Sequence, residues 1–444
     1  MKKLTEGTPL KLIIRFAIPI FIGRVFQMFY SLVDTRIVGD ILGETALAAV
    51  GSTSTLSDLL LGLLAGITSG FGIIIATYFG AKDEKNMKKS IGSTILFGAS
   101  AAILISIVSL LFLSPILDFL NITEELRPFS QAYIRIILIG LIADTFYNIF
   151  ASILRAIGDS FTPLIFLIIS TVLNIVLDYG FILYLKMGVA GAAYATVIAQ
   201  AVSALLCFLY MKRKYPELKL SRNDFVPDKT INIQLLSTGS SMAFMNAFVQ
   251  LGTFILQTSI NTFGTNVIVA HTAARKLTAL FMLPWAALGS TLATFCGQNL
   301  GAQKYSRIKK GLRDTIFLSW IWCVVVIVIA YSCSPFLIQL ITASNEPEII
   351  ETGALYLKVN TLFYFVTAVI SLSRNSMQGF GNNKTPVFSS SLELVTKVII
   401  AFALAPAIGY WGIIISEPIA WFIMVIPLVV NLLKNPLLKQ TDGP

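Results

Sequence analysis

The chain has 444 residues, of which 56% are hydrophobic and 13% are charged, and its mean hydropathy is +0.80. A soluble domain carries about 25% charged residues and could not bury this much apolar surface, so the composition excludes a soluble globular protein and indicates a multispanning membrane protein. The net charge of +10 does not indicate nucleic-acid binding, because the lysines and arginines lie in short segments between apolar runs.

Glycine, proline and charged residues divide the chain into twelve apolar runs. A spanning helix needs about 20 mostly apolar residues, and the runs are long enough for this. We place them near residues 12–39, 46–79, 91–117, 130–154, 162–185, 188–211, 233–262, 267–297, 315–341, 353–377, 386–408 and 411–433. The expected fold is therefore all-α, with twelve transmembrane helices.

The cations fall mainly in alternate segments between these runs, at 2–11, 82–89, 212–229 and 304–313. With twelve spans, all four segments lie on one side of the membrane. Cytoplasmic segments carry the excess of Lys and Arg, so we expect both termini in the cytoplasm and the protein in the cell inner or plasma membrane. We expect no cleavable signal peptide, because the first apolar run carries charged residues and lacks a small-residue cleavage site.

The chain also repeats itself at an offset of about half its length. Thr-Tyr-Phe-Gly-Ala-Lys at 77–82 recurs as Gln-Asn-Leu-Gly-Ala-Gln at 298–303, so that Gly80 corresponds to Gly301. Gly-Asp-Ser-Phe-Thr-Pro at 158–163 recurs as Gly-Asn-Asn-Lys-Thr-Pro at 381–386, at nearly the same offset. These pairs predict a six-helix lobe at 1–211, a cytoplasmic linker at 212–232 and a second six-helix lobe at 233–444.

Each predicted repeat holds an even number of spans, so the lobes share one orientation and are related by a pseudo-two-fold axis along the membrane normal. In transporters built this way the substrate path runs between the lobes, which rock to open alternately to each side. Duplicated halves also occur in membrane proteins that transport nothing.

Asp34 lies inside the first apolar run, where a charged side chain at mid-membrane costs at least ~2.5 kcal/mol. It is therefore a candidate cation or proton site; the alternative is an anchor near the helix end that pairs with Arg36. Asn174 and Asp178 are four residues apart and share one face of the fifth span. A low dielectric disfavours an ionised carboxylate, which favours proton uptake, whereas converging oxygen atoms also suit Na⁺, so the coupling ion stays open.

Seven short motifs spread over nearly the whole chain resemble those of the multidrug and toxic compound extrusion (MATE) family. They are Val-Asp-Thr-Arg-Ile-Val-Gly at 33–39, Phe-Gly-Ala at 79–81, Leu-Arg-Ala-Ile-Gly-Asp at 154–159, Leu-Asn-Ile-Val-Leu-Asp at 173–178, Met-Gly-Val-Ala-Gly-Ala-Ala at 187–193, Asn-Leu-Gly-Ala at 299–302 and Met-Gln-Gly-Phe-Gly at 377–381. The resemblance implies a two-lobe antiporter that expels organic cations and amphipathic drugs in exchange for H⁺ or Na⁺. It also implies that Asp34, Asn174 and Asp178 form a cation site in the amino-terminal lobe, with Tyr30 and Thr196 as further polar members.

The second predicted lobe is less clear. One branch of the family carries an acid in the seventh span, but the matching segment 251–257 here has none, which favours coupling through the first lobe. Glu393 and Lys397 are four residues apart in the order that pairs best on a helix, and we interpret them as a structural ion pair, with a substrate contact as the alternative. Asp144 and Glu417 are expected to make hydrogen bonds between packed helices.

Polar and adaptable apolar side chains in the spans are candidates for a substrate cavity. They are Gln27, Met28, Asn148, Phe150, Asn246, Gln250, Gln257, Met282 and Glu393.

We interpret the chain as an efflux transporter whose partners are small organic cations or amphipathic drugs and the lipid bilayer. It is expected to act as a monomer, without nucleic acid and without a cofactor, the coupling ion being H⁺ or Na⁺. A flippase for a lipid-linked sugar or polysaccharide precursor is the main alternative, and a channel is another. An intramembrane enzyme is not expected, because the chain has one histidine and no metal-ligand spacing or nucleophile and base.

Overall fold

The computed structural model describes residues 3–442, and within that range it contains helices and turns but no strand. Eleven helices are long and apolar enough to cross a membrane, and a bent pair of shorter helices makes a twelfth span if its two members are counted together. The pair is α11 (Pro347–Leu362) and α12 (Tyr364–Gly379), which meet at an angle of 59°. The predicted all-α, twelve-span, two-lobe fold is confirmed.

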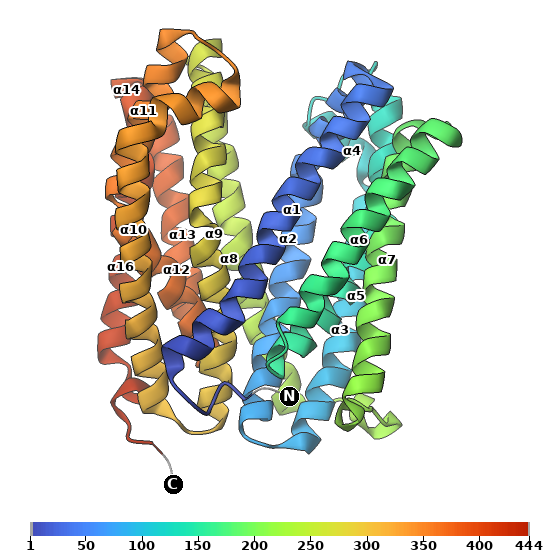
Figure 1. The fold of residues 1–444 in the computed structure, drawn as a ribbon, viewed down its shortest axis with the longest axis vertical. Coiled ribbons are helices and arrows are strands. Elements are labelled where there is room, and N and C mark those ends of the chain that lie inside the picture. The colour runs from blue at the N-terminus through green and yellow to red at the C-terminus, as the bar shows by residue number, and fades with distance from the viewer. Residues whose placement is uncertain (1–2, 443–444) are drawn as a thin grey trace. The chain divides into compact units, whose positions relative to one another are not determined.

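The first compact unit consists mainly of residues Ile18–Ala243. Its helices pack as a bundle in which α5 contacts α2, α3 and α7 (Figure 1). The elements are α2 (Glu44–Gly80), α3 (Glu84–Leu111), α4 (Leu113–Phe119), α5 (Arg127–Ala156), α6 (Phe161–Tyr179), the π-helical turn η1 (Gly180–Tyr184), α7 (Gly188–Lys214), and the short turns η2 (Pro216–Leu218) and η3 (Arg222–Phe225).

The second unit consists of Leu4–Ala17 together with the chain from Phe244 onward. Its core helix α9 contacts α10, α11 and α12, and α13 packs on α16. Besides α11 and α12 the elements are α9 (Thr265–Gly301), α10 (Tyr305–Thr342), α13 (Lys384–Ile399), the π-helical turn η4 (Ile400–Leu404), α14 (Ala405–Ile408), α15 (Tyr410–Ile414), α16 (Ser416–Lys434) and the turn η5 (Pro436–Lys439).

Two long helices contribute to both units. Helix α1 (Pro9–Leu42) belongs to the second unit as far as Ala17 and to the first from Ile18 onward. Helix α8 (Lys229–Ile260) belongs to the first unit as far as Ala243 and to the second from Phe244 onward. The starts of α1 and α8 therefore belong to the opposite compact unit from the rest of each helix. The linker at 212–232 that the repeat predicts stays a prediction.

Small residues allow the start of α8 to pack closely on α2 within the first unit. A methyl group built on Gly70 would lie 2.6 Å from the Cα atom of Gly239, and one built on Gly66 would lie 2.9 Å from the Cα atom of Ala243. Both distances are too short for real carbon atoms, so only residues without a side-chain carbon fit at Gly66 and Gly70. This crossing fixes where α8 leaves the first unit.

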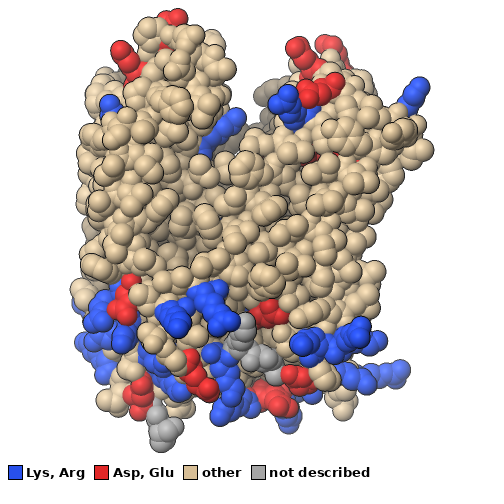
Figure 2. Space-filling view, in the orientation of Figure 1, with Lys and Arg blue, Asp and Glu red and all other residues tan. Residues whose placement is uncertain are grey.

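The surface has the character expected for a lipid environment. Large apolar side chains such as Leu104, Phe317 and Phe402 are more than half exposed. Lysines and arginines gather at one end of each unit, where α2 meets α3 in the first unit and where α9 meets α10 in the second (Figure 2).

Candidate functional site

The predicted acids of the first unit lie together in its interior. Asp34 is on α1, and Asn174 and Asp178 are on successive turns of α6. Asn174 and Asp178 are almost completely buried, with 1% and 0% of their surface exposed. The carboxyl groups of Asp34 and Asp178 lie close enough to interact electrostatically.

Several oxygen atoms of this cluster are buried without a hydrogen-bond donor among the described residues. They are Oδ1 of Asp34, both carboxyl oxygens of Asp178 and Oδ1 of Asn174. Buried polar atoms are normally hydrogen-bonded, and a buried carboxylate without a donor or counter-ion costs several kcal/mol. An arrangement of this kind can hold a proton or a cation between the two acids.

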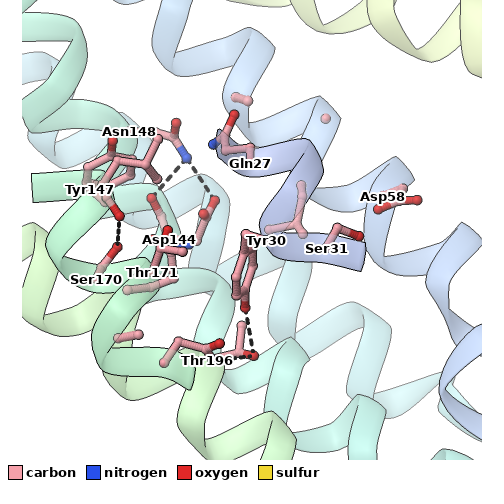
Figure 3. A pocket seen from close by; sticks show the side chains of 17 residues that line it. Gln27, Tyr30, Ser31, Asp58, Asp144, Tyr147, Asn148, Ser170, Thr171 and Thr196 are labelled. Atoms are coloured by element: carbon pink, nitrogen blue, oxygen red, sulfur yellow. Dashed lines mark hydrogen bonds between the residues drawn. The ribbon is translucent and has the colours of Figure 1, made fainter. Parts of the chain in front are cut away.

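Thr196, on α7, connects α1 to α6 at this cluster. Its hydroxyl oxygen lies 3.4 Å from the Tyr30 hydroxyl and 3.4 Å from Nδ2 of Asn174, and it donates a hydrogen bond to the carbonyl oxygen of Ala192 at 3.1 Å. Figure 3 shows the Tyr30 side chain directed toward Thr196. All five residues predicted for the cation site, including Asp34 and Asp178, therefore meet in one place, on α1, α6 and α7.

Two cavities, of about 390 and 200 Å³, adjoin this cluster inside the first unit. The smaller one reaches Asp34, the larger one reaches Asn174, and both are lined by Tyr30 and Thr196. The shared lining further includes Ser31, Asp58, Leu61, Asp144 and Gln200. The cavities are partly open and have mixed polar and apolar walls, which suits an amphipathic small molecule.

Two further acids belong to this lining. Asp58 is on α2 and is exposed, and Asp144 is on α5, where its carboxylate accepts a hydrogen bond from Nδ2 of Asn148 at 2.8 Å (Figure 3). The hydrogen bond expected between packed helices is instead made to Asn148, on the same helix as Asp144. Sequence reasoning missed Asp58, although an acid in the middle of the second apolar run was the available signal.

The other candidates for a substrate cavity are placed as follows. Gln27 and Asn148 line the larger cavity, and Figure 3 shows them on facing helices. Met28 is half-buried on α1 outside the lining of both cavities, and Phe150 packs in the hydrophobic core of the first unit beside Leu154.

The remaining candidates lie in the second unit. Asn246 and Met282 are half-buried and Gln250 is exposed. Gln257 donates a hydrogen bond to Asn261 just beyond the last turn of its own helix at 2.9 Å. Glu393 is 4% exposed and is engaged in ion pairs.

Those ion pairs belong to a charged network on four helices of the second unit, in which four side chains are buried and that of Arg275 is one-third exposed. Lys397 lies 3.0 Å from Oε1 of Glu393, as its spacing predicted, and 3.2 Å from Oε1 of Glu417. Arg374, on α12, lies 3.4 Å from Oε2 of Glu393, and Arg275, on α9, lies 3.1 Å from Oε1 of Glu417. The network thus holds three cations and two acids. Sequence reasoning found the pair on α13 and a contact of Glu417 with a packed helix, but it missed Arg275 and Arg374.

Among the described residues no group of three or more His, Cys, Asp or Glu side chains is arranged to hold a metal ion through such ligands. The cluster of Asp34, Asp178, Asn174, Tyr30 and Thr196 is not such a group, because it contains only two acids. Its other members contribute an amide and two hydroxyl groups. Oxygen atoms of this kind suit Na⁺ or a proton.

The fold and this site define a class of protein: a membrane transporter with duplicated halves and a polar, acid-lined interior. The MatE family model matches the chain twice, at residues 19–180 and 241–403. The second match starts half a chain after the first, which confirms the internal repeat read from the sequence. The chain belongs to the MatE family, and the resemblance noted in the sequence is confirmed. Members of the family are transporters, so the protein is not an enzyme.

The chain is similar to several curated bacterial proteins. It is 31% identical to the probable multidrug resistance protein YoeA of Bacillus subtilis over 74% of this chain and 73% of that protein. It is 28% identical to YpnP of the same organism, covering 81% and 80%, and 25% identical to NorM of Thermotoga maritima, covering 89% and 85%. All three are named as probable multidrug resistance proteins.

Solved structures share the fold. A MATE protein in a bent conformation superimposes with a TM-score of 0.92 at 24% identity, covering 98% of this chain and 97% of that one. A transporter of the MOP superfamily from Pyrococcus furiosus gives a TM-score of 0.89 at 23% identity, covering 99% and 98%. These likenesses establish the two-lobe helical fold.

Proposed function

We propose that this protein is a secondary active exporter that expels cationic or amphipathic drugs in exchange for H⁺ or Na⁺, by rocking of its two lobes. The family membership and the names of the curated relatives support transport of small molecules. The exchange and its residues are inferred from the interior of the first unit.

The observation that carries this proposal is the set of buried oxygen atoms without donors, among the described residues, on Asp34, Asp178 and Asn174. Two ionised carboxylates that interact in a low-dielectric interior repel each other, so a proton or a cation between them removes a large electrostatic penalty. A site that is incomplete without a small cation, and that adjoins two cavities, can exchange this cation for another positively charged group. A cationic drug supplies such a group.

Coupling then follows from competition between the drug and the ion for the same negative charges. Ion entry from outside is favoured by the ion gradient, and each net elementary charge that one exchange cycle moves inward gains about 2.3 kcal/mol per 100 mV of membrane potential. Binding of the ion neutralises the acids and releases the cationic drug. Loss of the ion restores the negative charge, which then binds the next drug molecule.

The charge distribution supports the proposed orientation. The basic ends of the two units carry the segments 82–89, 212–229 and 304–313, and by the positive-inside rule this supports the proposal that both termini are cytoplasmic. A plasma-membrane protein that acts as a monomer is proposed.

The lining of the cavities also bears on the flippase alternative. A lipid-linked sugar phosphate requires cations, whereas the cavities of the first unit are lined by Asp34, Asp58 and Asp144. This acidic lining favours a positively charged substrate.

The proposal is tested by dye efflux from inverted vesicles in which a proton gradient and a sodium gradient are imposed separately. In a one-for-one exchange of singly charged cations the membrane potential cancels, so a tenfold ion gradient, about 1.4 kcal/mol, sustains at most roughly a tenfold dye gradient. Asp34→Asn is expected to bring this gradient close to unity while the protein remains inserted.

Asp40→Asn is the matched control, because Asp40 lies on the same helix but is exposed and pairs with Arg36 at 3.2 Å. It should transport like the unchanged protein. Dye movement that ignores both gradients would instead indicate a channel, and full coupled efflux by the Asp34 variant would remove Asp34 from the mechanism.

A further inference from the structure

The duplication allows positions in the two units to be compared one by one. Helices α6 and α13 begin at Phe161 and Lys384, and the offset between these two starts also relates Pro163 to Pro386. At this offset, Asn174 corresponds to Lys397. The amide of the candidate cation site in the first unit is therefore replaced by an ammonium group in the second.

A second pair of equivalent positions lies on the neighbouring helices. Gly188 and Gly409 stand at the starts of α7 and α15, have φ angles of 60° and 67°, and mark the same point of the repeat. Counted from these two glycines, Thr196 corresponds to Glu417. A hydroxyl group in the first unit is therefore replaced by a carboxylate in the second.

The equivalent residues contact each other in both units. Nδ2 of Asn174 lies 3.4 Å from the hydroxyl oxygen of Thr196 in the first unit. Nζ of Lys397 lies 3.2 Å from Oε1 of Glu417 in the second. The same two helices are thus joined at the same position of the repeat, by a neutral pair in one unit and by an ion pair in the other.

The two places differ in how their oxygen atoms are satisfied. In the first unit, carboxyl oxygens of Asp34 and Asp178 have no donor among the described residues. In the second, Lys397 contacts Oε1 of both Glu393 and Glu417, at 3.0 and 3.2 Å. The acids themselves are not equivalent, because at these offsets Asp178 corresponds to Ala401 and Glu393 to Ser170. The second unit instead places two glutamates around a cation that is part of the chain.

We propose that the second unit has a cation site at the place of the repeat that corresponds to the contact of Asn174 with Thr196, and that the ammonium group of Lys397 fills it permanently. This inference rests on the proposed function of the first unit, where the cation is exchangeable. A tethered cation cannot leave, so the second lobe takes up no coupling ion, and exchange occurs through the first lobe alone.

A purely structural ion pair does not account for this placement. Buried ion pairs add little net stability compared with apolar residues of similar volume, so stability alone gives no reason for five charged side chains here. Their position at the repeat of the candidate ion site supplies a reason, because a lysine in that position keeps the lobe from binding a mobile ion.

The surroundings of Lys397 predict what happens when it is removed. The charged and titratable groups around it are Glu393 on its own helix, Glu417 on α16, Arg275 on α9, Arg374 on α12 and Tyr356 on α11. Without the lysine, each glutamate keeps one arginine partner, so the lobe can still fold. The oxygen atoms that held Nζ then face an empty space of the size of a small cation.

The test uses the full-length protein with Asp34→Asn and Asp178→Asn, which removes the ion site of the first lobe. In this background, Lys397→Asn is expected to gain one bound Na⁺ or one additional proton per chain. Binding is measured with radioactive sodium on purified protein and by proton uptake with a pH-sensitive dye. The melting temperature should rise by several degrees with the ion that binds.

Two controls isolate the cation. Lys397→Arg keeps a positive charge and should gain neither ion. Lys397→Asn combined with Glu417→Thr rebuilds the neutral pair of the first unit and should also gain neither, because only one carboxylate remains.

The inference is overturned if the background protein already binds an ion in its second lobe, or if folded Lys397→Asn gains none. It is also overturned if Lys397→Asn and Lys397→Gln fail to fold at every Na⁺ concentration and pH. If Lys397 occupies a cation site, a bound Na⁺ or proton should be able to replace its charge and allow these variants to fold. These measurements involve no transport, so they are separate from the efflux test, which decides the role of Asp34 by itself.

Discussion

Glu417 is the residue whose loss should most disturb the charge balance of the second unit. Its side chain is 6% exposed, and one oxygen atom, Oε1, lies 3.2 Å from Lys397 and 3.1 Å from Arg275. Glu417→Gln removes one of two acids from a network that has three cations. The buried cations are then left with Glu393 as their remaining acid.

The magnitude follows from this geometry. Breaking a buried ion pair from one side costs about 3–5 kcal/mol, because the remaining charge stays desolvated. For a unit of about 200 residues, each kcal/mol lowers the melting temperature by roughly 2–4 °C, so the expected decrease is roughly 6–20 °C. Lys397→Met should cost less, because Glu393 and Glu417 each retain an arginine.

The assay is a thermal ramp of detergent-purified protein, followed by size-exclusion chromatography to measure the fraction that stays monodisperse. Glu346→Gln is the control, because Glu346 is an exposed acid in the same unit whose side chain caps no helix. Its melting temperature should stay within about one or two degrees, as for most surface changes. The double variant of Glu417→Gln and Lys397→Met should recover most of the lost stability, since it restores the native excess of one cation.

The reasoning is refuted if Glu417→Gln melts like the unchanged protein, or if the double variant is less stable than Glu417→Gln alone. Either result would mean that the network tolerates an uncompensated charge in its interior.

Three further predictions concern the first unit. Gly70→Ala should lower the free energy of unfolding by about 1–3 kcal/mol, because the added methyl group would lie 2.6 Å from the Cα atom of Gly239. Gly62→Ala is the control: its methyl group meets no atom within 4 Å, so the variant should be neutral or stabilising in the same thermal assay. Asp144→Asn should raise the apparent KM of efflux roughly tenfold for a cationic dye and leave a neutral dye unaffected, because it removes a negative charge from both cavities. The backbone N–H of Ile231 and the nearby Lys89 hold the pKa of Asp228 below its usual range. The stabilising effect of Asp228 on the start of α8 should therefore be complete above the ordinary aspartate pKa of about 3.9 and be lost as the pH falls through the lowered value. The loss is measured as faster amide hydrogen exchange at residues 229–232, after correction for intrinsic exchange rates.

The sequence was sufficient for features that depend on one helix or on the whole chain. Hydropathy gave the twelve spans, because each must supply about 20 apolar residues by itself. The correspondence of Gly80 with Gly301 gave the repeat, because duplicated halves keep their turns. The position of an acid in a span, such as Asp34, indicated a polar interior, because an acid facing lipid is too costly.

Only the tertiary structure showed which side chains from different helices meet. Glu393 and Lys397 could be paired from their spacing, but Arg275, Arg374 and Glu417 come from three other helices, and no local pattern relates them. The same holds for Asp58 and Asp144 in the lining of the cavities. Spacing along the chain determines which face of one helix a residue occupies, whereas the packing of helices decides which faces come together and therefore which buried charges are paired.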